Sequence, residues 1–187
     1  TANDFLLVRL SWDTSNNEAS ETWSPFAKGG SYSPYYADVF LMVNWRSNGD
    51  ECKQYIIQRY PYLNGNAGFV AKNTDFYFRP GLTWPRRTTS GMSLRIMPQN
   101  CVFADKGPAA FFDMGNSDAS AFLSLIQSQA FQALVALQLA AGDAAARSYE
   151  VGVIQRTVVP SLDEQSTKVL VDYAHSAWST KRSTDTA

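Results

Sequence analysis

The sequence predicts an α+β fold, in which helices pack on a small mixed β-sheet. Two observations favour this class. Short β-prone runs separated by Gly-, Pro- and Asn-rich turns extend to about residue 105, whereas long helical spacing of apolar residues begins only near residue 118. Apolar residues make up 45% and charged residues 18% of the 187, which is typical of a globular chain with one core.

The first part of the chain predicts two strands and one short helix. A strand at Phe5–Trp12 should be followed by a polar loop at 13–22. Prolines and glycines exclude a regular element from the aromatic-rich stretch 23–36. A strand buried on both faces is expected at Asp38–Trp45, and a helix is expected from about Glu51 to Arg59 after the turn SNGDE.

The second part predicts three short strands followed by a helix and a further strand. The runs FYFRPGLTW, SLRIM and CVFAD are β-prone and follow a Gly- and Asn-rich loop. One long helix is expected over about 118–140, capped by Asn116 or Ser117 and ended by Gly142. The stretch 148–159 is then expected to form a strand.

The C-terminal segment predicts a second helix. Ser161–Glu164 has the S-x-x-E pattern of a capping box, and the tail 179–187 is polar and expected to fray. We therefore expect a core domain at 1–160 and a C-terminal helix with a frayed tail at 161–187. Apolar residues recur on one face of this helix: Val169, Leu170, Tyr173, Ala177 and Trp178.

Charge and cysteine content narrow the class of function. The net charge of −1 argues against a general polyanion binder, but five cationic residues and one carboxylate lie between Arg79 and Lys106, a local charge of +4. No apolar run is long enough to span a bilayer and no signal peptide begins the chain, which favours a cytoplasmic protein. In the cytoplasm, Cys52 and Cys101 should remain reduced thiols. With one histidine, His175, the chain lacks the ligands of a structural zinc site.

Catalytic motifs are absent from the sequence. It has no G-x-x-x-x-G-K-[ST] or G-x-G-x-x-G phosphate loop and no G-x-S-x-G nucleophile elbow. The N-P-P-[YF] element by which N6-adenine methyltransferases hold the target base is also missing. We therefore expect no catalytic, cofactor-binding or metal-binding residues here, and we favour a binding function.

Three stretches resemble one family. WSPFAKGGSYSPYYADVFLMVNWRSNGDECKQY, FYFRPGLTWPRRTTSGMSLRIMPQNCVFADKGPAAF and QSQAFQALVALQLAAGDAAARSYEVGVIQRTVVP are similar, in the same order, to segments beyond the catalytic domain of large bacterial N6-adenine DNA methyltransferases of the Eco57I-like and BREX phage-defence types. The resemblance implies a target-recognition domain that binds double-stranded DNA. S-adenosylmethionine and methyl transfer would belong to the catalytic domain of the same parent chain, which is the second expected partner.

The candidate DNA-binding residues centre on a strand-loop-strand unit. Arginine can pair with the guanine edge and hydroxyls suit phosphates, so the loop between Pro85 and Gly91 is the leading candidate; an ordinary solvated turn is the alternative. Lys28 with Gly29 and Gly30 could receive a phosphate, or form a plain glycine turn. The full set is Lys28, Gly29, Gly30, Arg79, Thr83, Arg86, Arg87, Thr88, Thr89, Ser90, Arg95 and Lys106.

Two alternatives remain for these residues and for the chain. Arg95 could instead be a strand residue paired to an acid, and Trp23, Trp45 and Trp84 are expected in the core rather than stacked on bases. The chain could also be a cytoplasmic module that holds a protein or a carbohydrate on aromatic loops. Arg86, Arg87 and Lys28 converging on one face would favour DNA, whereas an exposed Trp/Tyr cluster would favour the interaction module.

Because no cofactor motif is present, we predict that this chain alone does not bind S-adenosylmethionine or methylate DNA. Titration calorimetry of the 187-residue chain with S-adenosylmethionine should give no saturable heat. Tight binding of the cofactor to this chain would overturn the assignment of methyl transfer to another domain.

Overall fold

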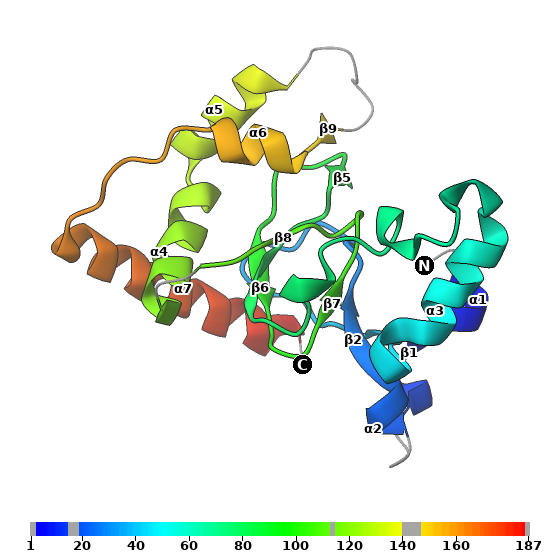
Figure 1. Ribbon diagram of the computed structural model, residues 1–187. Helices are drawn as coiled ribbons and strands as arrows, with labels where there is room; N and C mark the ends of the chain where they lie inside the picture. Colours follow the sequence, from blue (N-terminus) through cyan, green and yellow to red (C-terminus); the bar gives the residue numbers. More distant parts are fainter. Residues whose placement is uncertain (1–2, 15–18, 113–114, 140–146, 186–187) are drawn as a thin grey trace. The chain divides into compact units, whose positions relative to one another are not determined.

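The computed structural model describes residues 3–14, 19–112, 115–139 and 147–185 (Figure 1). Small sheets and packed helices make up these residues, which confirms the α+β class. The chain divides into two compact units. The first comprises Thr1–Ala27, Val39–Arg79 and Gln99–Phe103, and the second comprises Lys28–Asp38, Pro80–Pro98 and Ala104–Ala187.

The first unit contains a four-stranded sheet in the order β1-β3-β2-β7. Strands β1 (Val8–Leu10), β3 (Leu41–Asn44) and β2 (Trp23–Ala27) are antiparallel, and β7 (Val102–Phe103) runs parallel to β2. Val43 lies opposite β1 on one side and β2 on the other, and it is 1% exposed. The strand expected at 38–45 is therefore present as β3, between β1 and β2 in this sheet, although it is shorter than expected.

Strand β2 contains Pro25, so the exclusion of a regular element from 23–36 was wrong for the first residues of that stretch. Strand β3 pairs with Trp23, Ser24 and Pro25, and β7 pairs with β2 only from Phe26 onward. Proline has no N–H to donate, and it is tolerated where one pairing ends and the next begins.

The N-terminal strand is also shorter than expected. Residues Asp4–Leu7 form a helical turn, α1, in which the Asn3 side chain accepts a hydrogen bond from the Leu6 N–H at 3.3 Å. This cap competes successfully with β propensity, and the strand begins only at Val8. The first two residues of the loop expected at 13–22 belong to a 3-10 turn, Ser11–Thr14, and its last four form a helical turn, α2 (Ala19–Thr22). Residues 15–18 lie outside the described residues.

Helix α3 (Arg46–Arg59) contains the expected turn and the expected helix. Residues 47–49 have φ of 49°, 59° and 75°, so the regular part of the helix begins after them. Gly49 is required at this turn because a Cβ would lie 2.9 Å from ring atoms of Trp45. Three short 3-10 turns follow, at Pro61–Leu63, Ala67–Phe69 and Thr74–Phe76.

The second unit contains a three-stranded antiparallel sheet in the order β6-β4-β8. Its strands are β4 (Gly81–Thr83), β6 (Arg95–Met97) and β8 (Ala109–Ala110), and a separate ribbon pairs β5 (Arg87–Thr88) with β9 (Arg147–Ser148). The strand-loop-strand unit is thus confirmed, with shorter strands. The core beside it consists of Leu82, Trp84, Met92, Leu94, Leu123, Ile126, Phe131, Val135, Tyr149 and Ile154.

The long helix expected at 118–140 is two helices. Helices α4 (Gly115–Gln127) and α5 (Gln129–Gln138) meet at Ser128 with a bend of 72°. The Ser128 side chain accepts a hydrogen bond from the Phe131 N–H at 3.2 Å, so it caps α5 and separates it from α4. Apolar spacing continues across the break, which is why the sequence pattern did not reveal it. The expected stop at Gly142 lies outside the described residues.

The strand expected at 148–159 was wrong beyond its first residue. Tyr149 and Glu150 lead into helix α6 (Val151–Arg156), whose Ile154 and following Thr157 are buried. The Thr157 hydroxyl donates to the Val153 carbonyl at 2.9 Å, a contact one helical turn long. The β-branched composition indicated a strand, but the buried positions follow helical spacing.

Helix α7 (Glu164–Asp185) confirms the predicted C-terminal helix and corrects both of its ends. Asp163, rather than Ser161, is the cap, because its Oδ1 accepts from the Ser166 N–H at 2.7 Å, and this hydrogen bond lowers the pKa of Asp163. The tail expected to fray is helical as far as Asp185. Helix α7 packs against α4 (Figure 1). Between them, the Ser124 hydroxyl donates to the Leu170 carbonyl at 2.7 Å.

No single helix in the described part of the chain is long and apolar enough to cross a membrane. Helices α4 and α5 have sufficient length and apolar composition only when taken together across their bend.

Both cysteines are free and buried, which generates a prediction. Cys52 is 2% exposed and Cys101 is 0% exposed, and burial raises the pKa of Cys52 and raises that of Cys101 to about 11. We expect neither thiol to react with a disulfide-exchange reagent at pH 8 in the folded protein, since the thiolate is the reactive form. Two thiols should react after denaturation without reductant. No reactive thiol in the denatured chain would contradict this structure.

Candidate nucleic-acid interface

The arginine loop, residues 84–91, begins at β4 and returns towards β6. Trp84 and Pro85 at its start are buried, and the side chains of Arg87, Thr89 and Ser90 are exposed. At the tip, the Ser90 N–H donates to the Thr88 hydroxyl at 3.0 Å, so the turn is held by its own side chain. The loop therefore presents one guanidinium and hydroxyl groups on a short, internally bonded turn.

The base of the arginine loop is held by a chain of hydrogen bonds. The Trp84 indole N–H donates to the Tyr149 carbonyl at 2.9 Å, and the Tyr149 N–H donates to the Arg86 carbonyl at 2.6 Å. The Arg86 N–H donates in turn to the Lys106 carbonyl at 3.0 Å. Since Trp84 and Tyr149 are buried, these bonds are shielded from water and fix where the loop leaves the core.

Arg86 and Arg87 have different surroundings, although they are neighbours in sequence. The Arg86 guanidinium is bonded to Asp105, and its Nε lies 3.7 Å from Glu150 Oε1. Its side chain is only 24% exposed. Arg87 is exposed and lies in β5, opposite Ser148 of β9. The two carboxylates partly neutralise Arg86, and Arg87 is the more exposed of the two arginines.

The two Lys-Gly stretches lie together in the second unit. Gly29 has φ of 85°, and a Cβ on it would lie 2.5 Å from the Lys106 carbonyl oxygen, which the Arg86 N–H also contacts. The backbone at Gly29 therefore approaches another part of the same chain. Lys106 is exposed, Lys28 is half-buried, and Gly30, with φ of 122°, is exposed beside them. The structure thus brings Lys28 and Lys106 to the base of the arginine loop.

Arg95 is a strand residue, as the alternative proposed, but carbonyl groups rather than an acid receive its guanidinium. It is 7% exposed and donates to the Gly29 carbonyl and, at 3.2 Å, to the Ser31 carbonyl. Burial lowers the pKa of Arg95. These contacts make Arg95 a support for the Lys28–Ser31 segment, and a direct DNA contact by Arg95 stays a prediction.

Of two other candidates, one is buried in β4 and the other belongs to the first unit. Thr83 is 3% exposed, and its hydroxyl donates to the Pro108 carbonyl at 2.9 Å, which links β4 to the segment before β8. Arg79 belongs to the first unit, where its guanidinium lies 5.3 Å from the centre of the Phe76 ring. Trp45 and Trp84 are core residues as expected, whereas Trp23 is half-buried with Arg9 5.5 Å from its ring centre.

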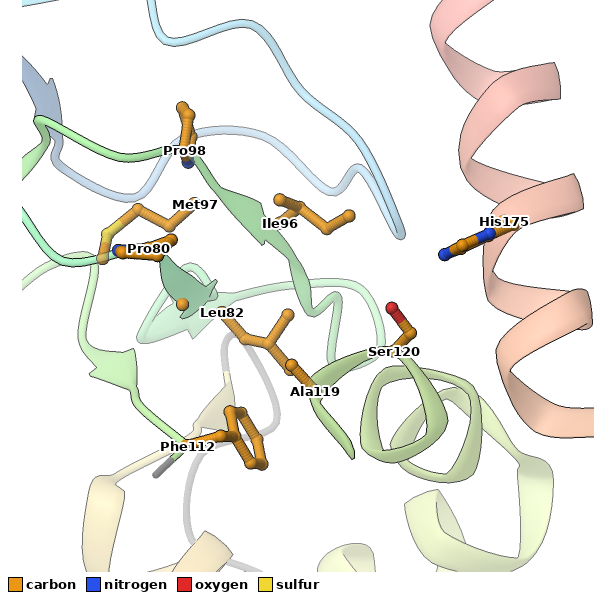
Figure 2. Close-up of a pocket in the computed structure, with 10 residues that line it drawn as sticks. Pro80, Leu82, Ile96, Met97, Pro98, Phe112, Ala119, Ser120 and His175 are labelled. Atoms are coloured by element: carbon orange, nitrogen blue, oxygen red, sulfur yellow. The ribbon is translucent and has the colours of Figure 1, made fainter. Parts of the chain in front are cut away.

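A cavity of about 420 Å³ also lies in the second unit (Figure 2). Figure 2 shows Ser120 of α4 and His175 of α7 on one side and the apolar side chains of β4 and β6 on the other. Among the described residues, no hydrogen bond joins Ser120 to His175. The hydrogen bond by which a nucleophile and its general base are recognised is therefore absent from this pair. Within the described residues, no group of three His, Cys, Asp or Glu side chains could hold a metal ion.

Comparison with known proteins gives partial matches. No family model matches the chain. It is 25% identical over 120 residues to the adenine-specific methyltransferase PglX of Lacticaseibacillus casei (strain Zhang). This match covers 58% of this chain and 10% of that protein. It is 30% identical over 105 residues to the adenine-specific methyltransferase BrxX of Escherichia coli O9:H4 (strain HS). This second match covers 56% of this chain and 8% of that protein.

The chain is similar to a part of two adenine-specific methyltransferases. The matches extend over more than half of this chain but over a tenth or less of each relative. What those proteins do as wholes therefore reaches this chain only as a proposal.

Sequence reasoning placed Ser148 in a strand but missed Arg147 and the pairing of this strand with the arginine loop. β9 places Arg147, which is exposed, opposite Thr88, and Tyr149 beside Arg86. The only local signal was an arginine directly before the β-prone run from Ser148 onward. Its pairing partner lies about 60 residues earlier, so periodicity could not have identified it.

The buried guanidinium of Arg95 generates a stability prediction. Arg95→Met should lower the free energy of unfolding by about 1–3 kcal/mol, because the carbonyls of Gly29 and Ser31 lose their donors. Arg87→Met is the matched control, and its effect should stay within about 0.5 kcal/mol because Arg87 is exposed. Urea unfolding measures both variants. Equal effects would show that the contacts of Arg95 are not structural.

Proposed function

We propose that this chain is the duplex-DNA recognition module of an adenine-specific DNA methyltransferase in a restriction-modification or phage-defence system. The partial similarity to two adenine-specific methyltransferases supports the methyltransferase context. The observation that carries DNA recognition is the arginine loop, which presents Arg87 with Thr89 and Ser90 from a base held by buried hydrogen bonds. A rigid base favours recognition because less conformational freedom is lost on binding.

Within this proposal, the residues of the loop have separate roles. Arg87 donates to the guanine edge in the major groove, where a guanidinium can make two parallel hydrogen bonds. Arg86 orients the loop through Asp105 and Glu150, and Lys28 and Lys106 add positive charge near phosphates. S-adenosylmethionine binding, base flipping and methyl transfer belong to the catalytic part of the parent protein.

A second candidate function rests on the first unit. Several aromatic side chains there are exposed, among them Trp12 at 64%, Tyr62 at 73% and Phe69 at 64%. Tyr62 also lies 5.8 Å from Tyr60, ring centre to ring centre. These residues support a module that holds a protein or a carbohydrate, the alternative that the sequence left open.

The test of DNA recognition is Arg87→Ala in the full-length protein that carries this chain. We expect the binding free energy for a duplex that carries the target sequence to weaken by about 1–3 kcal/mol, the range for an arginine paired with a base. The preference for this duplex over a scrambled one should also decrease. Fluorescence anisotropy at moderate salt measures both affinities, and methylation sequencing of genomic DNA identifies the target.

The matched control is Arg59→Ala, which removes an exposed arginine from the last turn of α3. It changes the net charge by the same amount, so it reports any effect of charge alone. Wild-type affinity and unchanged methylation sites in Arg87→Ala would reject the arginine loop as the reading element. Loss of binding to a protein or a glycan in Trp12→Ala, with DNA binding intact, would support the interaction module.

A further inference from the structure

The arginine loop has a second strand, and the two strands form a ribbon. β5 and β9 lie side by side (Figure 1). They are antiparallel, with Arg87 opposite Ser148 and Thr88 opposite Arg147. Directly opposed residues project from the same face of an antiparallel pair, and successive residues project from opposite faces. Each face of the ribbon therefore carries one arginine and one hydroxyl: Arg87 with Ser148, and Arg147 with Thr88.

Arg147 lies close to a residue whose backbone is bonded to the arginine loop. Two residues after Arg147, Tyr149 is 3% exposed, and both its N–H and its carbonyl are hydrogen-bonded to the loop, at Arg86 and Trp84. Between them, the Ser148 hydroxyl donates to Glu150 Oε1 at 2.8 Å. The backbone from which the Arg147 side chain projects is therefore held beside β5.

The dimensions of DNA suggest how such a ribbon could act. The major groove admits a two-stranded β-ribbon, with one face towards the base edges. The other face is then turned away from the bases, where phosphates are the available partners. Two arginines on opposite faces cannot both read bases.

We propose that Arg147 is a second DNA-contacting residue and that it binds a backbone phosphate while Arg87, on the opposite face, meets the bases. This inference rests on the proposed function. The β5–β9 ribbon, rather than the arginine loop alone, is then the element that enters the groove. Arg147 positions the protein on any duplex, and Arg87 selects among duplexes.

The test compares Arg147→Ala and Arg87→Ala in the full-length protein, with Arg59→Ala as the charge control. Arg147→Ala should weaken binding to target and scrambled duplexes by the same factor and leave the methylated sites unchanged. Between about 50 and about 200 mM salt, the loss of affinity of Arg147→Ala should be about 3.5-fold smaller than that of the wild-type protein. The reason is that one phosphate contact contributes about 0.9 to the slope of log affinity against log salt concentration. Arg147→Lys keeps the charge and should restore most of the binding.

Each outcome has one meaning. If Arg87→Ala behaves as proposed and Arg147→Ala resembles Arg59→Ala, this inference is wrong and the proposed function stands. If Arg147→Ala alters which sites are methylated, the division between the two faces is wrong. If neither variant changes binding, DNA recognition by this ribbon fails altogether. Should Arg147→Ala lower the melting temperature, Arg147→Gln provides the neutral variant with a longer side chain.

Discussion

The hydrogen bond from the Trp84 indole to the Tyr149 carbonyl joins two stretches that lie 65 residues apart, and the candidate interface depends on it. Both residues belong to the buried core of the second unit. If they separated, a buried donor would lose its partner, at a cost of about 1–3 kcal/mol. The bond also places β9 beside β5, because Tyr149 directly follows the strand. Core packing and the geometry of the proposed reading element are thus the same structural feature.

Local sequence signals predicted those elements whose causes are local. The turn at 47–49, the helix that follows it and the helix after Asp163 each combine a turn or a cap with apolar spacing. The errors arose where a more distant or subtler interaction decided the structure. Ser128 breaks a pattern that is apolar on both sides, and α6 is helical although residues 151–158 include five β-branched residues. Composition alone could not separate helix from strand there.

The candidate interface was predictable in part for the same reason. The strand-loop-strand unit and its arginines could be identified from the sequence, because a turn lies between two β-prone runs. The different surroundings of Arg86 and Arg87 could not, since they depend on Asp105 and Glu150, which lie 18 or more residues away in sequence. The same holds for Arg95, whose partners are carbonyl groups some 65 residues earlier. A guanidinium in a basic segment does not by itself indicate a ligand contact.

Gly29 has a consequence for how relatives of this chain should be compared. Its backbone lies so close to the Lys106 carbonyl that any side chain at this position would force the two segments apart. A glycine retained here throughout an alignment would therefore reflect contact between two parts of one chain. Such a glycine would not by itself indicate a site for phosphate, although a Lys-Gly-Gly stretch invites that interpretation. Under the proposed function, variation at position 87, whose side chain is exposed, would be the more informative measure of changing DNA preference.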